Sequence, residues 1–121
     1  MAVDQAFIDR VQELFAFVPE LKTRRMFGGL GVYSGEQMFA LGAGGEVFLK
    51  VDDVTRPRFE AEGLPPFAPT MRGEVVEMAS YRRMPEDAWD DEEVAREWTR
   101  LALDAALRAR SAKPPRKRKP A

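Results

Sequence analysis

The sequence predicts an α+β domain in which helices pack on an antiparallel sheet of about four or more strands. Three observations lead to this prediction. Amphipathic helical patterns lie near both ends, the strand-like runs between them are joined by turns too short for parallel crossovers, and a length of 121 residues suits one domain. The expected order of elements is α-β-β-β-α-β-α.

The first helix is predicted over residues 4–18. Asp4 is a suitable N-cap, and Pro19 should end the helix nearby because the residue before a proline disfavours the α conformation. Six apolar residues recur at helical spacing and make one broad stripe: Phe7, Ile8, Val11, Leu14, Phe15 and Val18.

Three strands are predicted next, over residues 25–33, 37–41 and 46–51. The first run contains three glycines, so we expect a kinked or bulged strand. The glycine-rich segment 42–45 reads as a hairpin loop. Because the connections are so short, the three strands should form an antiparallel meander.

A short helix is predicted over residues 54–62, ending at Gly63. A proline-rich extended loop follows, in which we expect Phe67 and Met71 to anchor the chain to the core. The fourth strand is predicted over residues 74–81, where β-branched and aromatic residues return.

The last helix should begin near Asp90 or Asp91. Asp90 with Glu93 fits a capping box with Asp as the cap. We expect Trp89 to pack against the first turn, for example on Val94. An apolar stripe, broadened by its last two members, runs along the helix: Val94, Trp98, Leu101, Ala102, Ala105, Leu103 and Leu107.

If all the helices cover one face of the sheet, the other face is open. Met38, Phe39 or Phe48 would then face solvent. Exposed apolar sheet faces commonly acquire a partner. We therefore predict a homodimer formed through an exposed sheet face or edge.

The composition excludes much catalytic chemistry, since the chain has no His and no Cys. Disulfides, thiolate nucleophiles, Ser–His–Asp triads and His- or Cys-ligated metals are therefore excluded. We expect no cofactor. No run approaches the length of a transmembrane helix, and the N-terminus lacks the basic start of a secretory signal, so we expect a cytoplasmic protein without membrane contact.

The near-neutral net charge of −1 conceals an uneven distribution. Residues 113–121 hold five cations and no acid, which leaves 14 basic against 20 acidic residues in the domain over 1–112, a net −6. We expect the Pro-rich segment 113–121 to be a disordered basic tail that either contacts a polyanion or only improves solubility. Its candidate contact residues are Lys113, Arg116, Lys117, Arg118 and Lys119.

Two glycine-rich segments resemble phosphate-binding loops only superficially. Residues 28–31 and 42–45 are each followed by a strand, whereas a phosphate loop leads into a helix whose N-terminus faces the anion. The carboxylate clusters at 52–53 and 90–93 precede helices, where capping explains them. None of these segments predicts a catalytic or metal site.

Four arginines and one lysine remain as candidates for anion contact or catalysis. Lys50 lies on a predicted strand, opposite the apolar face. Arg24 and Arg25 lie at the border of one predicted strand and Arg82 and Arg83 at that of another. The two pairs are candidates to hold an anion together if their strands are neighbours, and otherwise are solvated strand ends.

Several runs resemble the N-terminal domain of the TfoX/Sxy family. They are Arg25–Tyr33 (RMFGGLGVY), Met38–Leu41 (MFAL) and Phe48–Asp52 (FLKVD). The order continues along the chain with single positions and pairs: Gly63, Pro66-Phe67, Met71, Tyr81, Pro85-Glu86, Trp98 and Ala105-Ala106. The similarity spans roughly residues 5–107.

This resemblance implies an α+β domain of bacterial proteins, some of which regulate natural competence as coactivators beside the cyclic-AMP receptor protein. It implies no catalytic residue. Full-length regulators carry a second, helical domain, whereas this chain has a short basic tail, so we expect a stand-alone N-terminal domain.

Three functions follow as hypotheses. The first is a non-enzymatic regulatory domain that contacts itself and an unidentified regulatory protein, with the tail adding weak, nonspecific nucleic-acid affinity. The second is a nucleic-acid-binding accessory protein that uses the basic tail. The third is a small ligand-binding domain or an enzyme that works without His or Cys.

Overall fold

The computed structural model describes residues 3–26 and 28–112, and the predicted basic tail lies outside these residues. In chain order the elements are α1 (Gln5–Leu14), β1 (Leu21–Met26), β2 (Gly29–Ser34), β3 (Gln37–Ala43), β4 (Glu46–Lys50), α2 (Arg56–Ala61), β5 (Pro66–Phe67), β6 (Thr70–Met71), β7 (Glu74–Val75), β8 (Met78–Arg83), the 3-10 helix η1 (Glu86–Trp89) and α3 (Glu92–Ala112).

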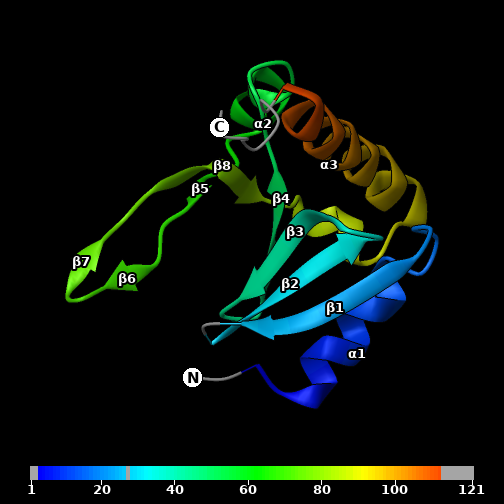
Figure 1. Cartoon of the computed structure of the whole chain (residues 1–121), viewed down its shortest axis with the longest axis horizontal. Helices are drawn as coiled ribbons and strands as arrows, with labels where there is room; N and C mark the ends of the chain where they lie inside the picture. The colour runs from blue at the N-terminus through cyan, green and yellow to red at the C-terminus, as the bar shows by residue number, and fades with distance from the viewer. Residues whose placement is uncertain (1–2, 27, 113–121) are drawn as a thin grey trace, which may run out of the picture.

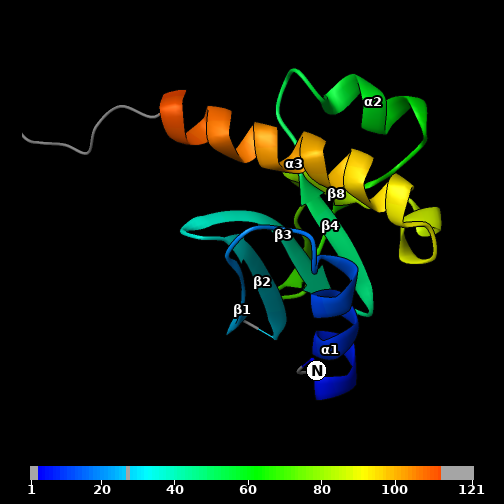
Figure 2. The ribbon, with the colours of Figure 1, turned by 90° about the vertical axis from the view of Figure 1, so that its right-hand side faces the viewer.

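Six of the strands form one antiparallel sheet in the order β1-β2-β3-β4-β8-β5, and β6 pairs with β7 alone (Figure 1). The predicted α+β fold is confirmed. The core gathers side chains from α1, α2, α3 and one face of the sheet. Figure 2 shows α3 extending across the sheet, where it contacts β3 and β4.

The first helix begins as predicted and ends early. The Asp4 side chain accepts a hydrogen bond of 2.9 Å from the backbone N–H of Phe7. The helix ends at Leu14, and Phe15 has left the helical conformation. Phe15 and Val18 are nevertheless buried, because the turn ahead of Pro19 folds them back onto the core.

The prediction of one kinked strand over residues 25–33 is wrong. The chain instead reverses after Met26, and β1 and β2 form a hairpin in which Met26 pairs with Gly29. Gly28 has φ of +78°, a left-handed conformation that glycine adopts without steric cost. The register shift lies further along, between Val32 and Tyr33, opposite β3.

The predicted strand over 74–81 is two strands, β7 and β8. The first of the two, β7, pairs with the preceding strand β6. The turn of this β6–β7 hairpin holds Arg72 and Gly73 at positive φ. The predicted core anchor Met71 is 51% exposed on this hairpin. Phe67 packs on Phe48, with ring centroids 4.8 Å apart, on the sheet face opposite the core.

The last helix is capped by Asp91 rather than Asp90. The Asp91 carboxylate accepts hydrogen bonds from the backbone N–H groups of Glu93 and Val94. Trp98, Ala102 and Ala105 are buried as the stripe predicts. Leu107, which is expected to broaden the stripe, is 58% exposed, although the preceding Ala105 and Ala106 are buried, so it lies on the outer side of α3.

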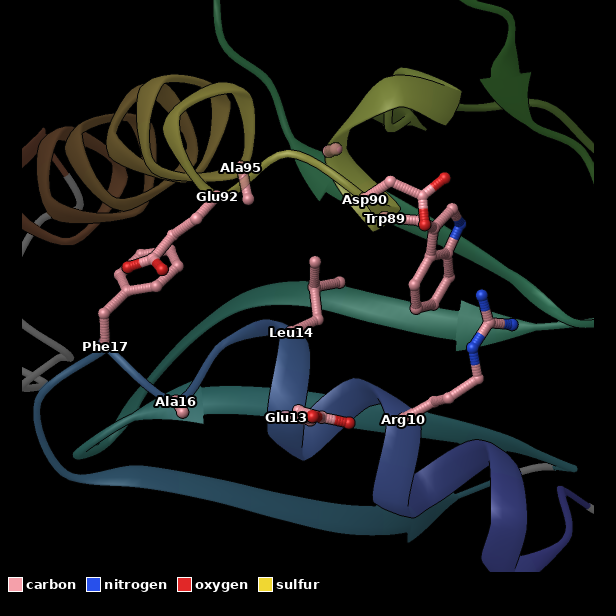
Figure 3. Close-up of a pocket in the computed structure, with 10 residues that line it drawn as sticks. Arg10, Glu13, Leu14, Ala16, Phe17, Trp89, Asp90, Glu92 and Ala95 are labelled. Carbon is pink, nitrogen blue, oxygen red and sulfur yellow. The ribbon is translucent and has the colours of Figure 1, made fainter.

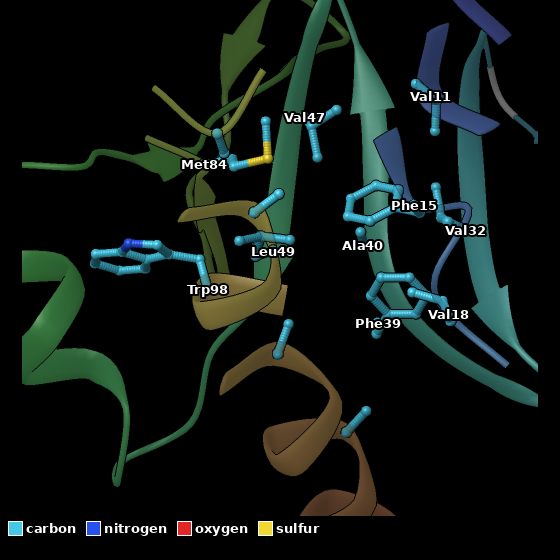
Figure 4. Packing of buried hydrophobic residues seen from close by; sticks show 14 of the residues in the cluster. Val11, Phe15, Val18, Val32, Phe39, Ala40, Val47, Leu49, Met84 and Trp98 are labelled. Atoms are coloured by element: carbon cyan, nitrogen blue, oxygen red, sulfur yellow. The ribbon is translucent and has the colours of Figure 1, made fainter. Parts of the chain in front are cut away.

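Two edge-to-face aromatic pairs lie in the core, and Figure 4 shows the first of them, Phe15 beside Phe39. The rings of Phe15 and Phe39 have centroids 5.1 Å apart and join the turn after α1 to the sheet. The rings of Phe59 and Trp98, 4.9 Å apart, join α2 to α3. All the helices therefore pack through one face of the sheet.

Candidate functional site

The sheet face that the helices leave open is built by strand alternation. On β4, Val47 and Leu49 enter the core, so Phe48 and Lys50 point to the open side. Cross-strand register adds Leu41, opposite Phe48, and Tyr81, opposite Lys50. The open face therefore combines aromatic, aliphatic and cationic side chains.

One of the three residues expected on this face is buried instead. Met38 and Phe48 are half-buried and line the open face, as predicted. Phe39 is fully buried, because the register shift beside Val32 turns it into the core against Phe15. A bulge that depends on two strands is not visible in the pattern of one strand.

A groove of about 730 Å³ follows this face. Its floor comes from β2, β3 and β4, and its far wall from the segment that leads into the β6–β7 hairpin. Large apolar side chains dominate the lining, with Glu46 and Arg83 as its charged members. The principal contributors are Met26, Met38, Leu41, Phe48, Phe67 and Met78.

The β6–β7 hairpin, which we call the arm (residues 70–78), projects from the domain beside this groove (Figure 1). Every residue from 70 to 80 is exposed. Four large apolar side chains are among them: Met71, Val75, Val76 and Met78. Among the described strands, β6 and β7 pair only with each other, and the Val76 N–H donates a hydrogen bond of 2.9 Å to the Pro69 carbonyl.

Cations surround the apolar floor. The Arg24 guanidinium lies 5.9 Å from the centroid of the Tyr33 ring, and the Lys50 ammonium lies 5.2 Å from that of Tyr81. Burial raises the pKa of Tyr81 to about 12, so this phenol stays neutral at physiological pH. Lys50 therefore faces an uncharged aromatic ring.

The two arginine pairs do not meet. Strands β2, β3 and β4 separate β1 from β8. The two arginine pairs are therefore not on neighbouring strands, as joint anion binding would require. Arg25 donates to the Val3 carbonyl at 2.6 Å, and Arg82 donates to that of Leu64 at 2.6 Å. Arg83 lies 3.8 Å from the Glu46 carboxylate.

A second pocket, of about 350 Å³, lies between α1 and η1 (Figure 3). Arg10 and Trp89 point toward each other across it, with the guanidinium 4.1 Å from the centroid of the indole ring. Trp89, predicted to pack on the first turn of the last helix, is half-buried and also bridges to α1. Glu13, Asp90 and Glu92 add acidic side chains to the lining, opposite in charge to Arg10.

Lys50 also borders an open hollow of about 300 Å³ with Glu36 and Arg110. The Glu36 side chain is 87% exposed and lies 3.9 Å from the ammonium of Lys22. The hollow therefore unites a lysine, an arginine and a carboxylate, with the carboxylate almost fully solvated and paired elsewhere.

The predicted helix-capping carboxylates have structural partners. Asp52 accepts hydrogen bonds from the backbone of Val54 and Thr55 and from Arg108, whose Nε lies 2.6 Å away. The bond to Arg108 lowers the pKa of Asp52 to about 2. Asp53 pairs with Arg56 on the surface. Within residues 3–26 and 28–112 there is no cluster of three or more acidic residues that could hold a metal ion.

The predicted polyanion contacts of residues 113–121 lie outside the described residues, so the structure does not place them. In the part of the chain that it does describe, no helix combines the length and the apolar character needed to cross a membrane.

The fold and the groove define a small α+β domain with one sheet face covered by helices and the other open. The chain belongs to the TfoX N-terminal domain family, whose model matches residues 13–106. This match confirms the resemblance drawn from the sequence. A comparison with curated proteins gives no match.

Proposed function

We propose that this chain is a non-enzymatic, cytoplasmic regulatory domain that works by binding a protein in the groove of its open sheet face. The observation that carries this proposal is the apolar groove of about 730 Å³ beside an exposed apolar arm. Contiguous exposed apolar surface is costly in water and is typical of protein interaction sites.

The chemistry of the groove favours a protein over a small polar ligand or DNA. Its charged lining residues, Glu46 and Arg83, already face each other. Residues 1–112 carry a net −6, which disfavours duplex DNA lying across the domain. Family membership supports a role like that of competence regulators, in which a transcriptional coactivator acts through protein contacts.

Site-specific photocrosslinking in the cells from which the protein comes tests this proposal. A photoreactive residue at Met38, in the groove, should give defined crosslinked species. The same residue at Leu107, an exposed apolar position outside the groove, serves as the matched control. Equal crosslinking at both positions, or none at Met38, contradicts a docking function for the groove.

The basic tail favours a second, weaker activity. Five cations in residues 113–121 suit nonspecific contact with nucleic acid. A chain that ends at residue 112 should lose the DNA affinity that the full chain shows at low salt. If salt-sensitive DNA binding survives the truncation, the DNA affinity belongs to the domain over residues 1–112 instead.

A further inference from the structure

We propose that the occupant of the groove is a second copy of this chain, which lays its β6–β7 arm into the groove while receiving the first copy's arm in its own. The inference rests on the proposed function of the groove as a docking site, and it names the partner.

The arm lacks support within its own chain. β6 and β7 contribute two residues each and pair only with each other. An isolated two-stranded hairpin is marginally stable in water, and three or more strands or a packing partner are normally needed. Val75 at the end of the arm is 69% exposed, so this hairpin presents apolar surface that nothing in the described chain covers.

The arm and the groove match in apolar character. The arm presents Val75 and Val76, which are 69% and 40% exposed, and the groove floor presents Met38, Leu41 and Phe48. Methionine side chains are flexible and adapt to irregular surfaces, so they suit an interface formed after folding. Packing the arm on the groove covers both apolar surfaces in one step.

The charges match as well. The arm carries Glu74 and Glu77 against Arg72, a net negative charge. On the open sheet face, Arg24 and Lys50 lie over tyrosine rings, and no carboxylate lies within ion-pair distance of either in the described chain. Both cations lie beside the groove rather than in its lining, so an acidic arm that reaches across this face meets two cations without an acidic partner among the described residues.

One chain carries both halves of the interface. Met71 and Met78 of the arm contribute to the groove lining of their own chain. The end of the arm projects away from the domain (Figure 1). A two-fold axis beside the arm would place each arm in the other copy's groove with identical contacts. Such a reciprocal interface closes on itself and gives a dimer rather than a filament.

The other occupants fit less well. Residues 113–121 offer five cations and no large apolar side chain, so they match neither the floor nor the charge of the face. Single-stranded nucleic acid would stack on Tyr33, Phe48 and Tyr81. Its phosphates would then approach the acidic arm, which disfavours this arrangement.

A charge-swap experiment on the full-length protein tests the dimer. In sedimentation equilibrium, we expect the wild-type chain to have twice the mass of a monomer. The arm variant Glu74→Lys/Glu77→Lys should raise the dissociation constant of the dimer at least about tenfold. The face variant Arg24→Glu/Lys50→Glu should do the same. Mixing the two variants should restore dimerisation, because each arm then meets a face of opposite charge.

Two controls keep the outcome clear. Circular dichroism checks that each variant is folded, and Val54→Asp, at an exposed apolar position outside the groove, should leave the dimer unchanged. A monomeric wild-type chain, dimers in both variants, or no recovery on mixing overturns the inference.

Two further outcomes separate this inference from the function on which it rests. If the chain is monomeric but Met38 still crosslinks to another protein, the docking function stands and the self-partner is wrong. If a fluorescent oligothymidylate binds and the Phe48→Ser variant loses it, the groove binds nucleic acid and both proposals are wrong.

Discussion

Val47 on β4 and Val75 on β7 are the same residue in the same type of backbone, yet Val47 is 1% exposed and Val75 is 69% exposed. Val47 faces the core side of a six-stranded sheet that helices cover. Val75 lies on a two-stranded arm that no other element of residues 3–26 and 28–112 covers. Strand propensity alone therefore does not stabilise a strand. The stabilisation comes from the side chains against which the strand packs.

The same contrast divides the molecule into two parts. In the core, apolar burial is complete within one chain and contributes to folding. In the arm and the groove, similar side chains remain at the surface and are available for association. Substitutions in the core should therefore change stability, and substitutions in the arm should change assembly.

The largest expected effect is from Phe39→Ala. Removing a fully buried ring that packs on Phe15 should lower the free energy of unfolding by about 3–5 kcal/mol in urea titrations. Phe67→Ala, which removes a ring from the groove wall, is the matched control and should cost about 1 kcal/mol. Equal costs would mean that the groove is packed as tightly as the core.

Asp52→Asn should have a smaller effect, of about 1 kcal/mol, because it removes the charge that binds Arg108 while keeping one carbonyl oxygen for the cap. Asp53→Asn is the matched control, since Asp53 is almost fully exposed and its pair with Arg56 should contribute little. Urea unfolding at neutral pH measures both. A larger loss from Asp53→Asn would contradict this view of the two aspartates.

The same carboxylate predicts an acid dependence. Its pKa is lowered from 3.8 to about 2 in the folded protein, so the unfolded chain binds this proton first. The Asp52 contribution should be fully present above about pH 4 and be lost as the pH falls toward 2. The stability difference between wild type and Asp52→Asn should shrink over this range, and a constant difference contradicts the assignment.

The smallest effect on stability is expected in the arm. Val75→Ser/Val76→Ser should change the free energy of unfolding by less than about 0.5 kcal/mol, because these side chains are exposed. The measurement is made at a concentration low enough to keep the chain monomeric. If the free energy of unfolding falls as much as for a substitution of a core valine, the arm packs on its own domain. The contrast between Val47 and Val75 would then not hold.

Much of the fold was predictable because it follows local patterns. The helix stripes, the Asp4 cap and the alternation on β4 are properties of neighbouring residues. The apolar pattern does not predict β1 before residue 25, because an edge strand rich in cations such as Lys22, Arg24 and Arg25 needs no continuous apolar pattern. The turn at Gly28 was interpreted as a bulge, since both use glycine.

The candidate site was predictable only in part. Met38 and Phe48 were placed correctly on an open face, because period-two alternation assigns faces. Phe39 was misplaced by the bulge, which belongs to a strand pair. The arm was not predicted, because residues 66–71 have no strand pattern and pair with segments further along the chain.

Sequence patterns are enough to predict an α+β domain, to show the resemblance to the TfoX N-terminal family and to exclude His- and Cys-based chemistry. The burial of Phe39, the separation of the two arginine pairs and the position of the arm beside an apolar groove emerge only from the folded chain. The physical reason is range: periodicity and capping act within a few residues, whereas register, strand order and burial depend on residues that are distant in the chain.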